Sequence, residues 1–212
     1  FAGMIGHGDA FVVRDPNGIR PAFWYQDEEV VVMASERPAI QMVFDVNFNA
    51  VKELKPAHAL IVKCDGRVSE VEFTEPKNRL ACSFERIYFS RGTDREIYQE
   101  RKKLGESLAR PILEAVNFEW KTTAFSYIPN TAEAAFYGLM HGVEKELNQW
   151  KTEQLIAEGP QISPEKMREI MEITPRFEKV AHKDEKIRTF ITPDETRQDL
   201  VSMIYDVTWG IV

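Results

Sequence analysis

The sequence lacks the features that mark exported, membrane-spanning and disulfide-rich proteins. Its two cysteines, Cys64 and Cys82, are too few for a disulfide framework. No apolar run approaches the roughly 20 residues that a membrane-spanning helix needs. The chain also starts without the basic and then apolar pattern of a secretory signal. We therefore expect free thiols, no membrane partner and a cytoplasmic location.

Several kinds of binding and catalytic motif are missing as well. The formal net charge is −7, whereas a general nucleic-acid-binding surface carries an excess of Lys and Arg that neutralises phosphates. The histidines lie far apart without metal-ligand spacing; they are His7, His58, His141 and His182. No glycine-rich nucleotide loop and no serine elbow occurs in the sequence. We expect no nucleic-acid partner and no zinc site.

The first part of the chain is predicted to consist of strands and tight turns. Short apolar segments predict strands at 10–13, 22–25 and 30–34 and a hairpin of 57–63 with 68–73. The sequence Asp15-Pro16-Asn17-Gly18 is a strong turn signal, because Pro fixes φ and Asn-Gly tolerates positive φ. A short helix is expected at 39–44, with Pro38 in its first turn and Ser35 as a candidate cap. Such a sheet needs a second layer to cover it.

The second part is predicted to alternate strands with helices. Residues 75–80 are polar and contain a proline, which is typical of a linker. Strands are expected at 83–90 and 122–128. Helices are expected from a Thr93/Glu96 capping box to about Pro111, from 132 to 150, from 163 to 173 and from 192 to 205. This alternation predicts an α/β domain at 81–212 after a first domain at 1–80.

One loop of the second part is a candidate binding site. Pro129, Asn130, Thr131 and Ala132 join a predicted strand to a strongly periodic helix. The free backbone N–H groups at such a helix start can accept an anion. Most strand-to-helix turns bind nothing, so the loop alone leaves a phosphate site and an ordinary connection both open. The basic stretch 176–191 has interleaved acidic residues, which favours a solvated charged face.

Ordered blocks of the sequence resemble a known family. The blocks are Arg14-Asp15-Pro16-Asn17-Gly18-Ile19-Arg20-Pro21, Ala34-Ser35-Glu36, Phe84-Glu85-Arg86-Ile87-Tyr88-Phe89-Ser90-Arg91, Ile128-Pro129-Asn130-Thr131 and Arg188-Thr189-Phe190-Ile191. Together they resemble the amidophosphoribosyltransferases of purine synthesis. The first block is also similar to turns of other class II glutamine amidotransferases, and the later blocks distinguish among them.

The resemblance implies a two-domain enzyme of mixed α+β and α/β class. Residues 1–80 would be the C-terminal part of an N-terminal-nucleophile sandwich, the class II glutaminase domain. Residues 81–212 would be a linker and the first part of a type I phosphoribosyltransferase domain. The parent enzyme would use glutamine and phosphoribosyl pyrophosphate to make 5-phosphoribosylamine, the first committed step of purine synthesis. A homo-oligomer is expected for the parent.

The resemblance also implies site residues. The nucleophilic N-terminal cysteine would lie upstream of Phe1, so no catalytic residue is expected in this chain. Pro129 to Ala132 would bind pyrophosphate, and Arg188 and Thr189 would belong to the flexible loop that closes over the substrate. Mg²⁺ is expected in the parent. Ala132 stands where the family carries a small hydroxyl residue linked to magnesium, which puts a metal contact there in doubt.

Two further expectations concern Cys82 and completeness. Cys82 matches an iron–sulfur ligand of some family members, but a cluster needs about four thiolates. We expect no cluster or other cofactor on this chain. The family's acidic phosphoribosyl pyrophosphate motif is absent and would follow Val212. The chain is thus predicted to be an internal fragment, inactive alone. The alternatives are a non-catalytic binding or regulatory protein that retains the frame, and another class II glutamine amidotransferase.

Overall fold

The computed structural model describes residues 1–183 and 200–211. These residues form two compact units, Phe1–Ile97 and Tyr98–Val212. In this division into compact units, residues 81–97 belong to the first unit. The predicted domain boundary between residues 80 and 81 stays a prediction. No described helix is long and apolar enough to cross a membrane.

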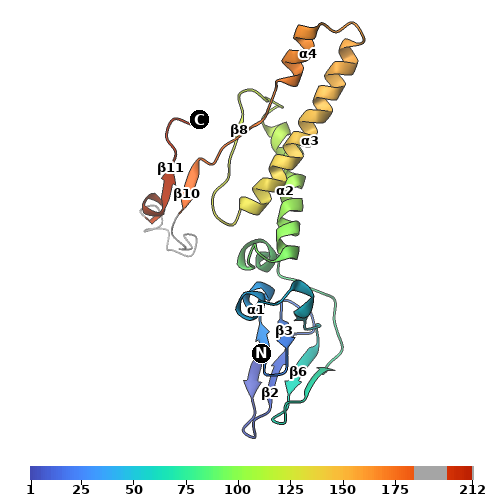
Figure 1. Cartoon of the computed structure of the whole chain (residues 1–212), viewed down its shortest axis with the longest axis vertical. Coiled ribbons are helices and arrows are strands. Elements are labelled where there is room, and N and C mark those ends of the chain that lie inside the picture. Colours follow the sequence, from blue (N-terminus) through green and yellow to red (C-terminus); the bar gives the residue numbers. More distant parts are fainter. Residues whose placement is uncertain (184–199, 212) are drawn as a thin grey trace. The chain divides into compact units, whose positions relative to one another are not determined.

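The first unit contains two antiparallel sheets (Figure 1). One sheet has the order β1 (Ala2–Met4), β2 (Ala10–Val13), β6 (His58–Val62) and β7 (Val68–Glu72). The other has the order β4 (Val31–Ala34), β3 (Phe23–Gln26) and β5 (Lys52–Glu53). Trp24 of the second sheet and Leu60 of the first share one buried cluster with Leu54. The predicted strands and hairpin are confirmed, and the second layer is the smaller sheet.

Helix α1 (Arg37–Phe44) follows β4 and precedes a 3₁₀ turn at Phe48–Ala50. Pro38 lies in its first turn, as predicted. Glu36 occupies the N-cap position without a side-chain hydrogen bond, so the prediction that Ser35 caps this helix is wrong. Ile40, on the inner face of α1, is buried in one cluster with Phe23.

A buried carboxylate ties two turns of the larger sheet together. Asp9 precedes β2 and accepts hydrogen bonds from Lys63 Nζ at 2.6 Å and from the Cys64 N–H at 3.0 Å. His7 Nε2 lies 2.9 Å from the same carboxylate. The Lys63 and His7 bonds, followed by the Cys64 bond, hold the pKa of Asp9 well below its usual range because each favours the charged form.

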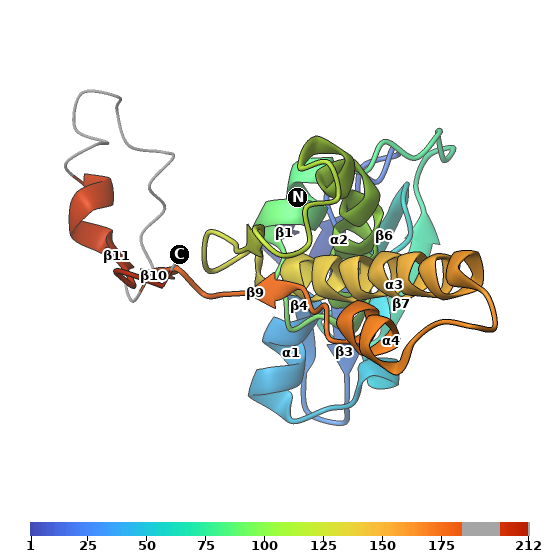
Figure 2. The same ribbon diagram turned by 90° about the horizontal axis from the view of Figure 1, so that it is seen from above.

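The second unit combines long helices with short strands (Figures 1 and 2). Its helices are α2 (Arg95–Ala115, whose first turn belongs to the first unit), α3 (Glu133–Glu158) and α4 (Pro164–Met171). Its strands are β8 (Ala124–Phe125), β9 (Arg176–Phe177), β10 (Ala181–Lys183) and β11 (Tyr205–Val207). Strands β8 and β9 pair in parallel, and α3 and α4 connect them. This connection is the strand–helix–strand unit expected of an α/β domain.

Several predicted elements differ from the structure. Residues 83–90 form a helical turn with a π-helix at Glu85–Phe89 instead of a strand. Phe84, Tyr88 and Phe89 contact one another there with ring centroids 5.5–6.2 Å apart. An aromatic cluster at four- and five-residue spacing therefore overrides the strand preference of the individual residues.

The observed helix boundaries also differ from the predicted ones. Asp94, and not Thr93, caps α2, because its carboxylate accepts from the N–H groups of Glu96 and Ile97. Pro111 does not end α2, since buried Leu113 in the following turn keeps the helix packed on the core. The strand predicted at 122–128 is limited to β8. Of the helix predicted at 192–205, residues 192–199 lie outside the described residues, 200–204 are helical, and Tyr205 starts β11.

The Ser163 cap is confirmed, since its Oγ accepts from the Lys166 N–H at 3.1 Å. Helix α4 then ends at Met171, two residues before the predicted end at 173. It packs on α3, and Ile170 is its buried residue.

Helices α2 and α3 pack with their backbones in direct contact. A Cβ added to Gly105 would overlap the Ala135 carbonyl group, and one added to Gly138 would overlap the Lys102 carbonyl group. At Gly142 the added atom would lie 2.6 Å from the Ala109 Cβ. Backbone atoms cannot move aside as side chains do, so these glycines fix the separation of the two helices.

We predict that Gly138→Ala destabilises the protein although alanine is the better helix former. Overlap with the Lys102 carbonyl forces the helices apart, and we expect the free energy of unfolding to fall by about 3 kcal/mol. Denaturant unfolding followed by circular dichroism measures this change. Gly6→Ala is the matched control, because nothing lies within 4 Å of its added Cβ. Equal stability of the two variants would contradict the close-packing account.

Candidate functional site

The predicted phosphate loop lies between β8 and the first turn of α3. The Pro129–Asn130 peptide is cis. The Asn130 carbonyl accepts from the Glu133 N–H at 3.2 Å, and the Ala132 carbonyl accepts from the Phe136 N–H at 2.9 Å. Ala132 is the N-cap residue of α3. Its methyl side chain cannot accept a hydrogen bond, so the first N–H groups of α3 have no side-chain acceptor at the cap position. The Asn130 side chain donates to the Lys183 carbonyl at 3.3 Å, which brings the end of β10 beside the loop.

A negative charge lies at this helix start. Glu133 is the first residue of α3, where a carboxylate interacts favourably with the helix dipole. Its Oε1 accepts from the Tyr137 hydroxyl at 3.3 Å. The Glu133 charge raises the pKa of Tyr137, because a nearby carboxylate disfavours the phenolate. Burial raises the pKa of Tyr127, and Glu133 adds to that rise. An incoming anion would meet the same carboxylate.

The other described residue that the sequence singled out, Cys82, belongs to the first unit, whereas this loop belongs to the second. Arg188 and Thr189 lie outside the described residues. Cys82 lies in the first unit, where its N–H donates to the Ile19 carbonyl at 3.2 Å. Its thiol is free and half-buried, and the Cys64 thiol is free and exposed.

Magnesium has no evident protein ligands in this segment. Among residues 1–183 and 200–211, no group of three or more His, Cys, Asp or Glu side chains could hold a metal ion. The Ala132 side chain offers no oxygen ligand. Mg²⁺ in phosphate sites is usually held by one or two carboxylates together with substrate phosphates, so magnesium in the whole protein stays an expectation.

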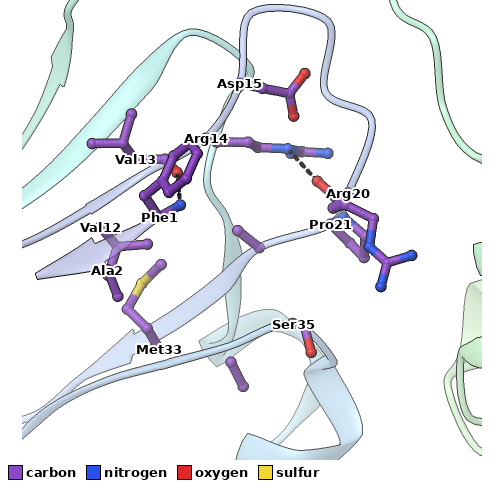
Figure 3. Close-up of a pocket in the computed structure, with 12 residues that line it drawn as sticks. Phe1, Ala2, Val12, Val13, Arg14, Asp15, Arg20, Pro21, Met33 and Ser35 are labelled. Atoms are coloured by element: carbon purple, nitrogen blue, oxygen red, sulfur yellow. Dashed lines mark hydrogen bonds between the residues drawn. The ribbon is translucent and has the colours of Figure 1, made fainter.

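A cavity of about 430 Å³ lies in the first unit (Figure 3). Apolar side chains from both sheets line much of it, among them Val12 and Met33, together with Pro21 of the loop before β3. Asp15, Arg20 and Ser35 also line it and contribute polar groups. The first sequence block that carried the resemblance therefore forms part of the cavity wall.

Arg14 organises the loop that forms this wall. The side chain is 4% exposed. Its Nε donates to the Arg20 carbonyl at 3.0 Å, and its guanidinium also binds the Leu54 carbonyl and Glu53 Oε1. The Asp15 carboxylate accepts from the N–H groups of Asn17 and Ile19, which closes the turn predicted from the sequence. Sequence reasoning identified the turn and missed Arg14 as its support.

Charged residues from three of the blocks pair with one another. Arg20 of the first block lies 2.8 Å from Glu85 of the third. Glu36 of the second lies 2.8 Å from Arg91 of the third. The third is followed by Asp94, which pairs with Arg37 at 3.2 Å. Blocks separated in the sequence thus meet in one network within the first unit. The pairing could not be read from the sequence, because each charge has many possible partners.

Comparison with known proteins places the sequence in context. No family model matches the chain. A Bacillus subtilis amidophosphoribosyltransferase is 35% identical over 106 residues, which is 48% of this chain and 21% of that protein. One from Lachancea kluyveri is 30% identical over 142 residues, 61% of this chain and 27% of that protein. Over these regions the chain is similar in sequence to amidophosphoribosyltransferases. It spans about a quarter of the length of these curated relatives.

Two solved structures share the fold of this chain. The B. subtilis glutamine phosphoribosylpyrophosphate amidotransferase, complexed with ADP and GMP, has a TM-score of 0.61 at 24% identity. A structure described as the allosteric regulatory enzyme of purine biosynthesis has a TM-score of 0.63 at 24% identity. Each match covers 96% of this chain and 37% of the solved chain. The mixed architecture predicted from the sequence is therefore confirmed at the level of the fold.

We predict that Glu133→Gln lowers the pKa of Tyr137 toward its ordinary value of 10.0. The substitution removes the negative charge that disfavours the phenolate, so the sign of the change is downward. A smaller fall is expected for Tyr127, because burial is the largest cause of its raised pKa. Nuclear magnetic resonance of ¹³Cζ-labelled tyrosine during a pH titration resolves each residue. Glu158→Gln, at the other end of α3, should leave both values unchanged.

Proposed function

We propose that the chain is part of an enzyme that makes 5-phosphoribosylamine from glutamine and phosphoribosyl pyrophosphate. The first unit would belong to the N-terminal-nucleophile glutaminase sandwich. The second would belong to the type I phosphoribosyltransferase domain. Sequence similarity to amidophosphoribosyltransferases supports this proposal. The observation that carries the transferase part is the parallel β8–β9 pair, joined through a helix whose N-terminus follows the loop at 129–132.

The loop would bind the pyrophosphate group through backbone N–H donors. A helix N-terminus supplies both free donors and a favourable dipole for an anion. Ala132 leaves this end without a side-chain cap. Glu133 opposes binding, because its carboxylate lies in the first turn. Arg188 would supply positive charge to the developing pyrophosphate in the closed enzyme. We therefore expect the isolated segment to bind pyrophosphate weakly.

Neither half-reaction is expected from this polypeptide alone. A class II glutaminase uses the thiol and the α-amine of one terminal cysteine. Cys64 and Cys82 are both interior and have no free α-amine. The strand ending in paired acids, which the family uses for phosphoribosyl pyrophosphate, does not occur among the 212 residues. We assign the reacting groups, the homo-oligomer and the cytoplasmic location to the whole protein. A non-catalytic protein that retains the frame is the competing proposal.

Pyrophosphate titration of the ¹⁵N-labelled chain tests the loop assignment. We expect chemical-shift changes confined to amides near 130–134. Glu133→Gln should tighten binding by about fivefold, because one repelling charge is removed at short range in a wet site. Glu158→Gln is the charge-matched control and should bind as the unchanged chain does. Shifts spread over the basic surface, or equal effects of both substitutions, would contradict a site at this loop.

Activity assays test the assignment of the reacting groups to other parts of the whole protein. The purified 212-residue chain should hydrolyse no glutamine and form no phosphoribosylamine. Glutamate release and pyrophosphate release measure the two half-reactions separately. Sustained turnover in either assay would overturn this part of the proposal without affecting the pyrophosphate measurement.

A further inference from the structure

Residues 77–85 run along the loop that forms the wall of the cavity, and residues 91–96 pair with Glu36 and Arg37. The N–H groups of Lys77, Leu80 and Cys82 donate in order to the carbonyls of Pro16, Asn17 and Ile19, at 2.9–3.2 Å. The Asn17 side chain also donates to the Asn78 carbonyl at 3.0 Å. Donors and acceptors advance in the same order, so the segment and the loop run in the same direction. We call residues 77–85 the strap.

Ion pairs that differ in burial follow this contact along the chain. Arg20 and Glu85 form the first pair, with side chains 63% and 6% exposed. Arg37 and Asp94 form the most buried pair, with side chains 5% and 6% exposed, and Arg37 also lies 3.3 Å from the half-exposed Glu96. The Arg37 guanidinium also lies 3.9 Å from the Phe48 ring centroid and 4.7 Å from that of Phe23. We call Arg37 and Asp94 the anchor.

The two ends of the segment differ in how easily they can separate from the first unit. Residues 77–81 are exposed, so water can replace their backbone hydrogen bonds at little cost. Breaking the anchor would leave the buried Asp94 without its cationic partner and the buried Arg37 with only the half-exposed Glu96, 3.3 Å away, which is strongly unfavourable. The Arg20–Glu85 pair lies between these extremes. Glu85 is buried, while Arg20 can turn into solvent.

We propose that the strap is a releasable element, held closed by the Arg20–Glu85 pair and separating from loop 15–21 while the anchor stays intact. Loop residues Asp15, Arg20 and Pro21 line the cavity of about 430 Å³. Release of the strap therefore frees one wall of the cavity, whereas the Asp94 cap keeps the start of α2 in place. This inference concerns the first unit and does not depend on the proposed function.

Amide hydrogen exchange, resolved by nuclear magnetic resonance on the whole chain, tests the order of release. Arg20→Met leaves the buried Glu85 without its partner, so exchange at Leu80 and Cys82 should become about tenfold faster. Exchange at Glu96 and Ile97 should stay unchanged, because the anchor is untouched. Arg67→Met is the control. Its exposed pair with Asp65 lies away from the strap, and it should leave all four amides unchanged.

Three results would overturn the proposal. The first is unchanged exchange at Leu80 and Cys82 in both Arg20→Met and the more conservative Glu85→Gln. The second is equal acceleration of the strap and anchor amides, which would mean that the segment opens as one unit. The third concerns the Met33 methyl resonance, which reports on the cavity. It should shift in Glu85→Gln, which lies outside the cavity lining, and not in Arg67→Met, and an unchanged signal would separate the strap from the cavity.

Discussion

The first unit depends on one buried guanidinium. Arg37 is 4% exposed and joins four separate parts of the chain. It starts α1, stacks on Phe23 of β3 and Phe48 of the 3₁₀ turn, and pairs with Asp94 at the cap of α2. A buried charge is costly unless its partners replace water. These partners are arranged by different elements, so the charge is stable only when all of them are in place. Arg37 therefore makes assembly of the unit cooperative.

Short-range sequence patterns correctly predicted those elements of this unit that depend only on residues close together in the chain. The Asp15-Pro16-Asn17-Gly18 turn and the hairpin of β6 and β7 follow from residues close together in the chain. The turn needs a positive φ at Gly18, which is +57° in the structure, and the sequence supplies the residue that tolerates it. Such elements need no knowledge of the rest of the fold.

Non-local packing decided the parts that the sequence did not predict. Residues 83–90 have strand-forming side chains, yet burial of Glu85 beside Arg20 and clustering of Phe84 with Phe89 favour helical turns. Likewise, Pro111 remains inside α2 because the tertiary contacts of its neighbours outweigh the lost hydrogen bond. The candidate loop could be located from its strand and helix patterns. The direction of the Glu133 carboxylate toward Tyr137 could not, since it depends on side-chain geometry.

The network in the first unit also bears on what sequence resemblance means here. Arg20, Glu36, Glu85 and Arg91 belong to the blocks that resemble amidophosphoribosyltransferases, and in this structure they pair with one another. Their contacts hold a frame together and need no substrate. A protein that kept the frame but lost the chemistry would retain the same pairs. The proposed transferase chemistry is therefore better tested at the loop at 129–132 and its neighbour Glu133, where binding of an anion would depend on charge and not on packing.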